Sequence, residues 1–270
     1  MIKLIVSDLD ETLLNHERHV DALNKAAISR AMAQNVLVMI ATGRGYYSTL
    51  ELQHELQLNQ QEHAYSITFN GGLTMDNKTE TIIASDTLDP DLVHRLFDHA
   101  MTIGICFEVY TLTRAYVFNA NDDEKKYISV FPNIEFCTEK TLEPLKDQPI
   151  FKVIFESLDQ AVLKQVEAAL EPELKRHLNL LYSSSRYLEC VPEGCSKGNA
   201  LQRLCKRLSI DVNDVLAIGD NHNDLSMLEC AGYSATVANA LEEVKTHVDY
   251  CSPYDHNHNA VADILQHFDL

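Results

Sequence analysis

Short apolar segments alternate with amphipathic segments at the start of the chain. Residues 2–7 and 36–41 are apolar runs of the length of a buried strand, and residues 64–69 are expected to form a third strand. Residues 21–35 carry apolar side chains at helical spacing, and residues 46–56 also favour a helix. Because parallel strands need crossover connections that are usually helical, this order predicts a parallel sheet with helices between its strands.

The alternation of strands and helices stops in the middle of the chain, where predicted strands follow one another directly. Residues 73–75 and 81–85 flank Asp76-Asn77-Lys78, a sequence typical of a hairpin turn. Further strands are expected at 105–110, 115–119, 151–156, 178–183 and 187–191, and helices at 90–101, 122–130 and 159–170. Adjacent strands without helices between them predict an α+β segment with a largely antiparallel sheet.

The alternation of strands and helices returns after residue 194. Helices are expected at 197–208, 224–230, 241–247 and 260–268, and strands at 215–218 and 233–237. The two ends of the chain, residues 1–85 and 189–270, are therefore predicted to form one α/β domain. Residues 86–188 are predicted to form a second domain that is inserted into the first.

Composition and charge exclude several classes of partner. The formal net charge is −18, and the densest basic stretches are pairs such as Lys125-Lys126, which argues against nucleic acid. No apolar stretch approaches the ~18 residues of a membrane helix. The N-terminal apolar run is too short for a signal peptide. The seven cysteines are scattered without a Cys-x-x-Cys pair, so we expect a cytoplasmic protein with reduced, mostly buried thiols.

Two acids, Asp8 and Asp10, follow the first predicted strand. Ligands of open α/β sheets bind beyond the carboxyl ends of the strands, so Asp8 is expected at the floor of a cleft. Asp10 could face the same cleft from the following loop. Such a pair can divide nucleophilic attack and proton transfer between its members. The alternative is that the acids only form a turn or a helix cap.

Two more polar loops follow the next apolar runs. Thr42-Gly43-Arg44 offers a hydroxyl and an uncrowded backbone N–H at the entrance of a helix, which suits a phosphate. An ordinary turn would have the same sequence. Asn70-Gly71-Gly72 is compatible with a tight turn, a substrate-contacting loop or the start of a hinge, and we favour a turn with a hinge.

The C-terminal part supplies a cation and further oxygen ligands. Lys197 begins a predicted helix, and Gly219–Asp224 follows the strand at 215–218. The acids and asparagines of this loop are hard oxygen ligands of the kind that Mg²⁺ selects. Taken alone, Lys197 fits an ordinary surface lysine, and residues 219–224 fit a polar loop that caps the next helix. One sheet edge that gathered all of them would hold every group that phosphoryl transfer requires.

These motifs, in this order, resemble those of the haloacid dehalogenase superfamily, and most closely its Cof-type or class IIB sugar-phosphatase branch. The branch has Asp-x-Asp-Gly-Thr, Thr-Gly-Arg, Lys-Gly and Gly-Asp-x-x-Asn-Asp, matched here by residues 8–12, 42–44, 197–198 and 219–224. The Asn-Gly-Gly also falls where the branch places it, so the resemblance covers nearly the whole chain. It implies a Rossmann-like α/β core with a parallel sheet and an inserted α+β cap domain, of the C2B type, that closes over the substrate.

The resemblance also implies a role for each site residue. Asp8 would attack phosphorus and become an aspartyl phosphate, while Asp10 would protonate the leaving alkoxide and then deprotonate water. Mg²⁺ would be held by the side chains of Asp8 and Asp220 and by the backbone carbonyl of Asp10. The phosphate would be held by Thr42, Lys197, Asn223 and the N–H groups of Leu9 and Gly43. Asp224 would orient Lys197 or a metal-bound water, and Arg44 would reach the substrate or the cap, or pair with an acid.

Two consequences follow for the first loop. Because Asp10 must be protonated for its first step, its pKa is expected to be raised by its surroundings. Glu11 stands where the family usually has glycine. If this position needs a positive φ, a non-glycine residue costs ~1 kcal/mol or more. The superfamily also contains Asp-x-Asp-Glu-Thr members, among phosphatases that act on polymerase tails, so Glu11 is compatible with catalysis.

Two other histidine-containing segments are interpreted as solvated loops. In Asp255–Asn259, His256 and His258 are expected in solvent, with Asn259 as a helix N-cap, although a substrate contact stays open. His222 is expected to face solvent and not to act as the general base.

The sequence therefore predicts a Mg²⁺-dependent phosphatase of small phosphorylated metabolites, such as sugar phosphates or phosphorylated cofactors. The alternatives are a phosphotransferase or phosphomutase with the same intermediate, and a non-catalytic protein that binds a phosphorylated ligand. The sequence determines neither the physiological substrate nor the choice between a monomer and a homodimer.

Overall fold

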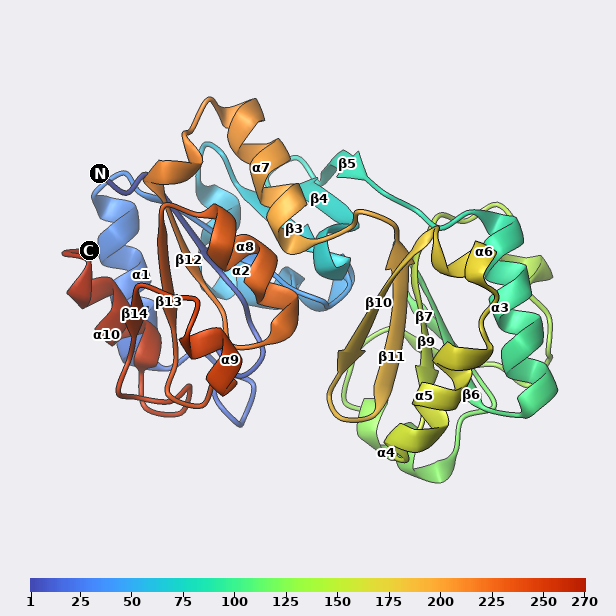
Figure 1. Cartoon of the computed structure of the whole chain (residues 1–270). Helices are drawn as coiled ribbons and strands as arrows, with labels where there is room; N and C mark the ends of the chain where they lie inside the picture. The colour runs from blue at the N-terminus through green and yellow to red at the C-terminus, as the bar shows by residue number, and fades with distance from the viewer. The chain divides into compact units, whose positions relative to one another are not determined.

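The computed structural model describes all 270 residues, and the chain divides into two compact units (Figure 1). The first unit comprises Met1–Gly43, Leu50–Ala84 and Ser196–Leu270, and the second comprises Arg44–Thr49 and Ser85–Cys195. The boundary expected at residue 188 falls inside a strand of the second unit. That strand is hydrogen-bonded on both sides within one sheet, which keeps the chain in the second unit as far as Cys195.

The first unit is built on an eight-stranded sheet. In spatial order, its strands are β14 (Tyr250–Cys251), β13 (Tyr233–Thr236), β12 (Val215–Ile218), β1 (Leu4–Ser7), β2 (Leu37–Ala41), β3 (Tyr65–Thr68), β4 (Leu73–Asp76) and β5 (Thr81–Ser85). Neighbouring strands are parallel from β14 to β3, whereas β4 is antiparallel to β3. The predicted α/β class with a parallel sheet is confirmed.

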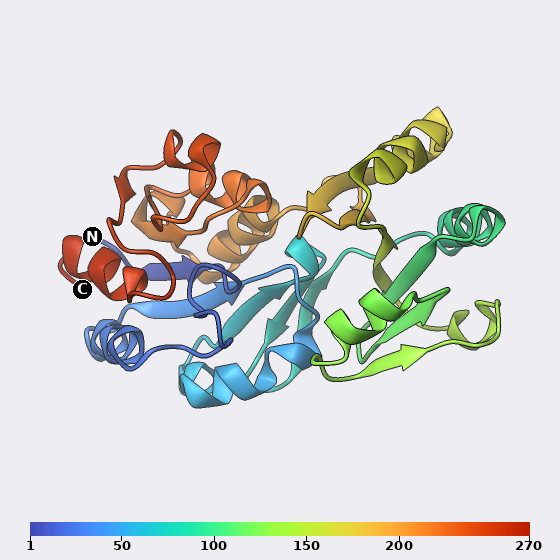
Figure 2. The same ribbon diagram turned by 90° about the horizontal axis from the view of Figure 1, so that it is seen from below.

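Helices cover both faces of this sheet, which explains why its central strands are apolar throughout. The helices are α1 (Ala22–Ala33), α2 (Leu50–Glu55), α7 (Lys197–Leu208), α8 (Leu225–Cys230), α9 (Glu242–Lys245) and α10 (Ala260–His267). Figure 2 shows α7 and α8 on the face opposite α1 and α2. Leu4, Val6 and Ile218 have no measurable exposure in the core between these layers.

Two local predictions outside the sheets were wrong. The helix expected at 46–56 is interrupted, because a 3₁₀ turn at Tyr46–Ser48 ends at Thr49 before α2 begins. The Thr49 hydroxyl donates to the Tyr46 carbonyl at 2.8 Å and closes that turn. Asn259 precedes α10 but does not cap it with its side chain, because its backbone is in the left-handed region with φ of 63°.

None of the helices of the chain is both long and apolar enough to span a membrane.

The second unit contains a six-stranded sheet with four helices. In spatial order, its strands are β10 (Leu178–Ser183), β11 (Tyr187–Pro192), β9 (Ile150–Glu156), β6 (Cys106–Thr111), β7 (Ala115–Phe118) and β8 (Ile134–Phe136). The helices are α3 (Pro90–Ile103), α4 (Asp122–Ile128), α5 (Gln160–Ala169) and α6 (Pro172–Lys175). Every strand pair is antiparallel except β7 with β8, as expected for a largely antiparallel sheet.

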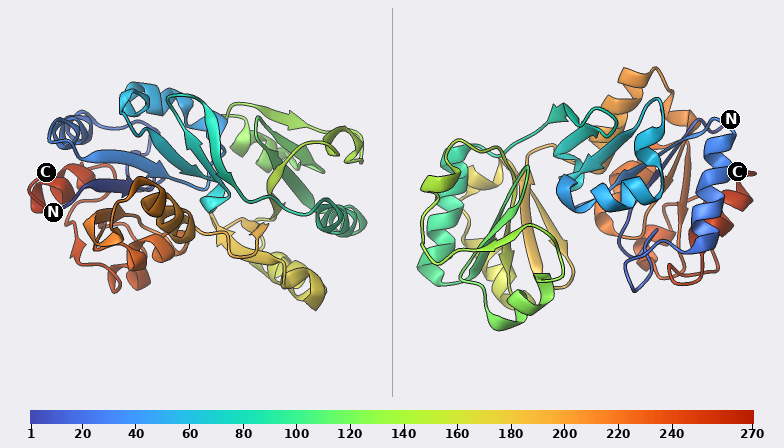
Figure 3. Two further views of the ribbon diagram at one scale, coloured as in Figure 1. Left: turned by 90° about the horizontal axis from the view of Figure 1, so that it is seen from above. Right: turned by 180° about the vertical axis from the view of Figure 1, so that it is seen from behind.

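The two faces of this sheet differ in polarity. Helices α3 and α5 pack on an apolar face that includes Phe107 and Phe155 (Figure 3). Successive side chains of a strand point to opposite faces, so the neighbouring positions Glu108 and Glu156 lie on the other face, where α4 packs. This second face therefore buries acids beside a small apolar cluster of Cys106, Val117 and Ile128.

A hydrogen-bonded group of acids ties α4 to that polar face. Tyr110 donates to Glu108 at 2.6 Å, and Tyr187 donates to Glu124 of α4 at 2.6 Å. The Arg186 guanidinium lies 2.8 Å from Glu124 and 3.2 Å from Glu156, and it also pairs with Asp123 and stacks on Tyr127. Burial and the charge of Glu124 raise the pKa of Glu108 to about 8, although the bond from Tyr110 acts in the opposite direction. Glu108 is thus a buried carboxyl that favours its neutral form.

Glu108→Gln is expected to stabilise the second unit in mildly alkaline solution and to change little near pH 5. The folded pKa of Glu108 lies above its unfolded value of 4.5, so the free energy of unfolding falls as the pH rises from 4.5 to about 8 and levels off above that. This one group contributes a slope of at most about 1.4 kcal/mol per pH unit. Glutamine does not titrate, yet it can accept from Tyr110 and donate to Glu124. Urea unfolding at a series of pH values measures the effect.

The exposed Glu139 supplies the control, since Glu139→Gln should leave the pH dependence of unfolding unchanged. Parallel pH curves for the wild type and Glu108→Gln would contradict the prediction.

Candidate active site

Three central strands of the first unit bring the predicted loops together. β1 lies between β12 and β2, and its last residue, Ser7, pairs with Ile218 on one side and Ile40 on the other. The strands β12, β1 and β2 therefore end at nearly the same level of the sheet. Asp8 follows β1, flanked by the loop of residues 219–224 and by the loop that begins at Thr42.

A buried lysine joins two of these loops. Lys197 Nζ donates to Asp8 Oδ1 at 2.5 Å and to Asp224 Oδ1 at 2.6 Å. Asp224 and Lys197 have no measurable exposure, and Asp8 is buried. Burial alone would lower the pKa of Lys197, but the charges of Asp224 and Asp8 outweigh burial and raise it. Lys197 is therefore a fixed cation in contact with Asp8.

Gly198 sets the position of this lysine at the start of α7. A Cβ at Gly198 would lie 2.1 Å from the carbonyl oxygen of Ser226 in α8, so no larger residue fits. The Gly198 N–H also donates to the Ser226 hydroxyl at 3.1 Å. The Lys-Gly motif thus reflects close packing of α7 on α8, which points the lysine at the strand edge.

The loop of residues 219–224 holds a second acid beside Asp8. Asp224 Oδ2 accepts the N–H groups of Asp220 and Asn221, at 2.9 and 3.1 Å, and so fixes the course of this loop. Asp220 Oδ1 accepts the hydroxyl of Thr12 at 2.8 Å. Thr12 lies within the first motif, but the sequence alone did not indicate that it links the first and last motifs.

The acids of this cluster fit a divalent cation. Carboxylate oxygens of Asp8, Asp220 and Asp224 all lie within 4.8 Å of one another. Both oxygens of Asp224 are engaged, whereas Asp8 and Asp220 each use only Oδ1. Burial, with neighbouring acids, raises the pKa of Asp8 to about 7 and that of Asp220 to about 8. The cluster therefore has more negative charge than Lys197 can neutralise, and its hard oxygens suit Mg²⁺.

The other predicted site residues lie around this cluster. Asp10 has an exposed side chain, and its charge lies close enough to raise the pKa of Asp8. Leu9 is buried, and its carbonyl accepts the N–H groups of Leu13 and Leu14, which shapes the loop. Thr42 is buried at the end of β2, next to Gly43. Asn223 donates to the Asn70 carboxamide at 3.0 Å.

Arg44 belongs with the second unit, unlike the other site residues. Its guanidinium lies 5.7 Å from the centre of the Phe131 ring, in the same unit. A contact with the inserted domain, one of the alternatives considered for Arg44, is thus present, and its role toward the substrate stays a prediction.

The histidines outside the cluster are held by local contacts. His222 is exposed and lies 2.8 Å from Glu243. His258 is exposed and pairs with Asp255 at 2.7 Å, while the backbone N–H of His256 donates to Asn239. The prediction of a solvated side chain therefore holds for His258, whereas His256 is half-buried and its Nδ1 lies in the interior.

Glu11 occupies a position that favours glycine. Its φ is 59°, in the left-handed region, and its side chain is exposed. The Glu11 carbonyl accepts a hydrogen bond from Asn239 at 2.8 Å, which holds this conformation. The departure from the usual motif is therefore accommodated by backbone strain, and the next residue, Thr12, still donates to Asp220.

Glu11→Gly is expected to raise the free energy of unfolding by about 0.5–1 kcal/mol. The left-handed region costs a non-glycine residue roughly 1–2 kcal/mol, and the greater freedom of glycine in the unfolded chain offsets part of the gain. Denaturant unfolding checks the change, with Glu17→Gly as the control in the same loop region. A destabilised Glu11→Gly variant would show that the Glu11 side chain holds the loop.

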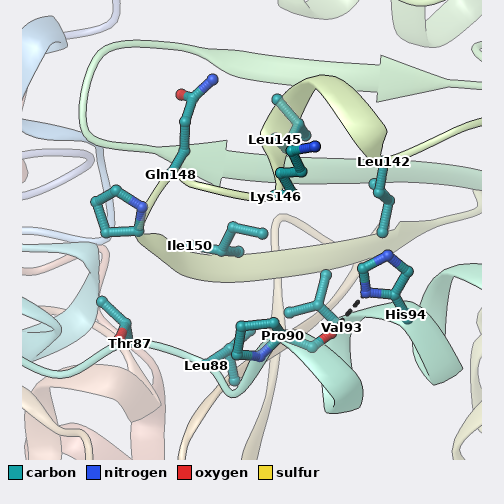
Figure 4. Close-up of a pocket in the computed structure, with 11 residues that line it drawn as sticks. Thr87, Leu88, Pro90, Val93, His94, Leu142, Leu145, Lys146, Gln148 and Ile150 are labelled. Carbon is teal, nitrogen blue, oxygen red and sulfur yellow. Dashed lines mark hydrogen bonds between the residues drawn. The ribbon is translucent and has the colours of Figure 1, made fainter.

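A small cavity in the second unit is separate from the acid cluster. It measures about 110 Å³ and lies between the start of α3 and the segment before β9 (Figure 4). Leu88, Val93 and Ile150 form its apolar wall, and His94 is engaged with the Pro90 carbonyl at 2.8 Å. No set of acids converges there, so it is not the candidate active site.

Comparison with known proteins decides the family. A family model described as haloacid dehalogenase-like hydrolase matches residues 5–265. The chain belongs to this family. Within it, the chain is a member of the Cof-type branch and a phosphatase.

Several relatives of this haloacid dehalogenase-like hydrolase cover nearly the whole chain. The 5-amino-6-(5-phospho-D-ribitylamino)uracil phosphatase YwtE of Bacillus subtilis is 31% identical over 271 residues, covering 90% of each chain. The HMP-PP phosphatase of Serratia proteamaculans is 27% identical over 276 residues, covering 99% of this chain and 96% of its own. The crystal structure of a haloacid dehalogenase-like hydrolase from Bacteroides thetaiotaomicron aligns with a TM-score of 0.88 at 27% identity, covering 99% and 100% of the two chains.

Proposed function

We propose that this hydrolase cleaves small phosphate monoesters with the help of Mg²⁺, through an aspartyl phosphate on Asp8. The observation that carries the proposal is the buried contact of Asp8 with Lys197, beside an Asp220 close enough to share a cation with Asp8. This arrangement offers a nucleophile, a fixed positive charge and metal ligands at one edge of the sheet.

In the first step, a carboxylate oxygen of Asp8 forms a bond to phosphorus, and the bond from phosphorus to the ester oxygen breaks. Asp10 gives its proton to the leaving alkoxide. In the second step, Asp10 takes a proton from water, the resulting hydroxide attacks phosphorus, and orthophosphate leaves Asp8.

The remaining residues hold the phosphate and the metal. Thr42, Lys197, Asn223 and the N–H groups of Leu9 and Gly43 would bind the phosphate oxygens, and Lys197 would stabilise their charge as the bonds change. Asp8, Asp220 and the backbone carbonyl of Asp10 would hold the metal. Bound Mg²⁺ would supply positive charge that offsets the repulsion between Asp8 and the phosphate. Asp224 would keep Lys197 and the loop of residues 219–224 in position.

The proposed substrates are small phosphorylated metabolites, and the second unit is proposed to act as a cap that selects among them. The names of the relatives suggest phosphorylated ribitylaminouracil compounds and HMP-PP as the first compounds to test. A cytoplasmic location is proposed too, and it agrees with seven cysteines that form no disulfide bond.

Hydrolysis of p-nitrophenyl phosphate with and without Mg²⁺ tests the proposal. We expect turnover that EDTA abolishes and Mg²⁺ restores. Binding of orthophosphate without turnover would favour a non-catalytic binding protein. Transfer of the phosphoryl group to a sugar acceptor at the expense of water would favour a phosphotransferase or phosphomutase. A screen of phosphorylated metabolites would then identify the preferred substrate.

A further inference from the structure

The segment after β3 has an unusual backbone. Phe69, Asn70 and Gly71 follow one another with φ values of 52°, 55° and 102°. Residues other than glycine and asparagine rarely enter this left-handed region, and a fully buried phenylalanine there is an outlier. Such a conformation persists only where its surroundings impose it, and it is frequent near functional sites.

Asn70 contacts two of the loops proposed to hold the phosphate. Its Oδ1 accepts from Nδ2 of Asn223 at 3.0 Å, and its backbone N–H donates to the Thr42 carbonyl at 3.0 Å. The Asn70 carboxamide also lies 3.0 Å from the position that a Cβ on Gly43 would take. Asn70 is only 3% exposed, so these contacts are made in the interior.

Gly71 brings the same segment against the start of α7. A Cβ at Gly71 would lie 2.2 Å from the Ser196 carbonyl oxygen and 3.2 Å from the backbone nitrogen of Lys197. The segment therefore contacts all three parts of the chain that supply proposed phosphate ligands, namely the regions of Thr42, Lys197 and Asn223.

We propose that Asn70 is a positioning residue for the phosphate site, an inference that rests on the proposed function. The Asn223 carboxamide has two N–H donors, and Asn70 Oδ1 accepts a hydrogen bond from one of them. This bond fixes the orientation of the Asn223 carboxamide, so its second N–H is already oriented before the phosphate binds. The contacts with Thr42 and Gly43 hold the loop that supplies other proposed phosphate ligands. Asn70 itself takes no part in bond making.

Asn70→Gly is the decisive variant, because glycine keeps the left-handed backbone and loses only the carboxamide. We expect KM for p-nitrophenyl phosphate and the inhibition constant of orthophosphate to rise about tenfold, since a misplaced ligand weakens phosphate binding. The Mg²⁺ concentration that gives half-maximal activity should stay unchanged, because Asp8 is held by Lys197 and Asp220 by Thr12. The matched control is Asn77→Gly, which removes a buried asparagine bonded to Ser66 away from these loops and should leave both constants unchanged.

A double variant separates positioning from general support of the fold. If Asn70 acts through Asn223, then Asn70→Gly combined with Asn223→Ala should raise KM little beyond Asn223→Ala alone. Wild-type constants in Asn70→Gly, fully multiplicative effects in the double variant, or an equal loss of Mg²⁺ affinity would each overturn the inference.

Orthophosphate binding, measured by calorimetry in Mg²⁺, keeps this test independent of turnover. If the wild type hydrolyses no phosphate ester, the proposed function fails, but weaker orthophosphate binding in Asn70→Gly would still support the positioning role. Equal binding by the two proteins, or no binding by the wild type, would overturn it.

Discussion

Asp8→Asn is expected to lower kcat for phosphate monoesters by about 10⁴-fold or more. The amide has almost the shape of the carboxylate but no charge, and its oxygen is a much weaker nucleophile. Lys197 keeps its contact with Asp224, so the variant should remain folded. Burial and nearby acids already raise the pKa of Asp8, and loss of this charge relieves repulsion from Asp224 and Asp10.

Steady-state kinetics measure the loss, and acid quenching with a ³²P-labelled substrate tests its cause. The wild type should retain label on the protein, and Asp8→Asn should retain none. Asp89→Asn is the matched control, because asparagine caps a helix about as well as the aspartate that now caps α3. Activity of Asp8→Asn close to that of the wild type would refute the assignment of the nucleophile. Equal label in both proteins would refute it as well.

Individual strands and helices could be inferred from the sequence where they are strongly patterned. The apolar runs of β1, β2 and β12 and the helical spacing of α7 predicted those elements within one or two residues. β8, α6 and β14 were missed, since they have three, four and two residues and little hydrophobic periodicity. Such short elements form because a neighbouring strand or helix supports them, and local sequence does not encode that support.

In the candidate site, too, the residue types could be predicted from the sequence, whereas the contacts between distant residues could not. The acids, Lys197 and Thr42 could be singled out because their residue types suit phosphate chemistry. The contacts of Thr12 with Asp220 and of Asn70 with Asn223 join positions more than 150 residues apart. Nothing in the neighbourhood of either residue indicates its partner. Glu11 is the opposite case, because the motif already suggested the positive φ that the structure has.

Lys197→Met is expected to lower both activity and stability by large amounts. Methionine fills a similar volume but leaves the buried carboxylates of Asp8 and Asp224 without their cation. Removing one partner of a buried ion pair costs about 3–5 kcal/mol of unfolding free energy. The loss of the charge that is proposed to stabilise the transferring group should lower kcat by about 10²- to 10⁴-fold.

A second substitution separates the two effects. Lys197→Met combined with Asp224→Asn removes one of the unpaired charges, and asparagine can still accept the N–H groups of Asp220 and Asn221. The double variant should recover part of the lost stability in urea unfolding, whereas kcat should stay as low as in Lys197→Met. If kcat recovered together with stability, Lys197 would serve only to neutralise buried acids. If neither variant lost stability, the ion pairs of Lys197 would not persist in solution, and the fixed cation on which the proposed mechanism depends would be absent.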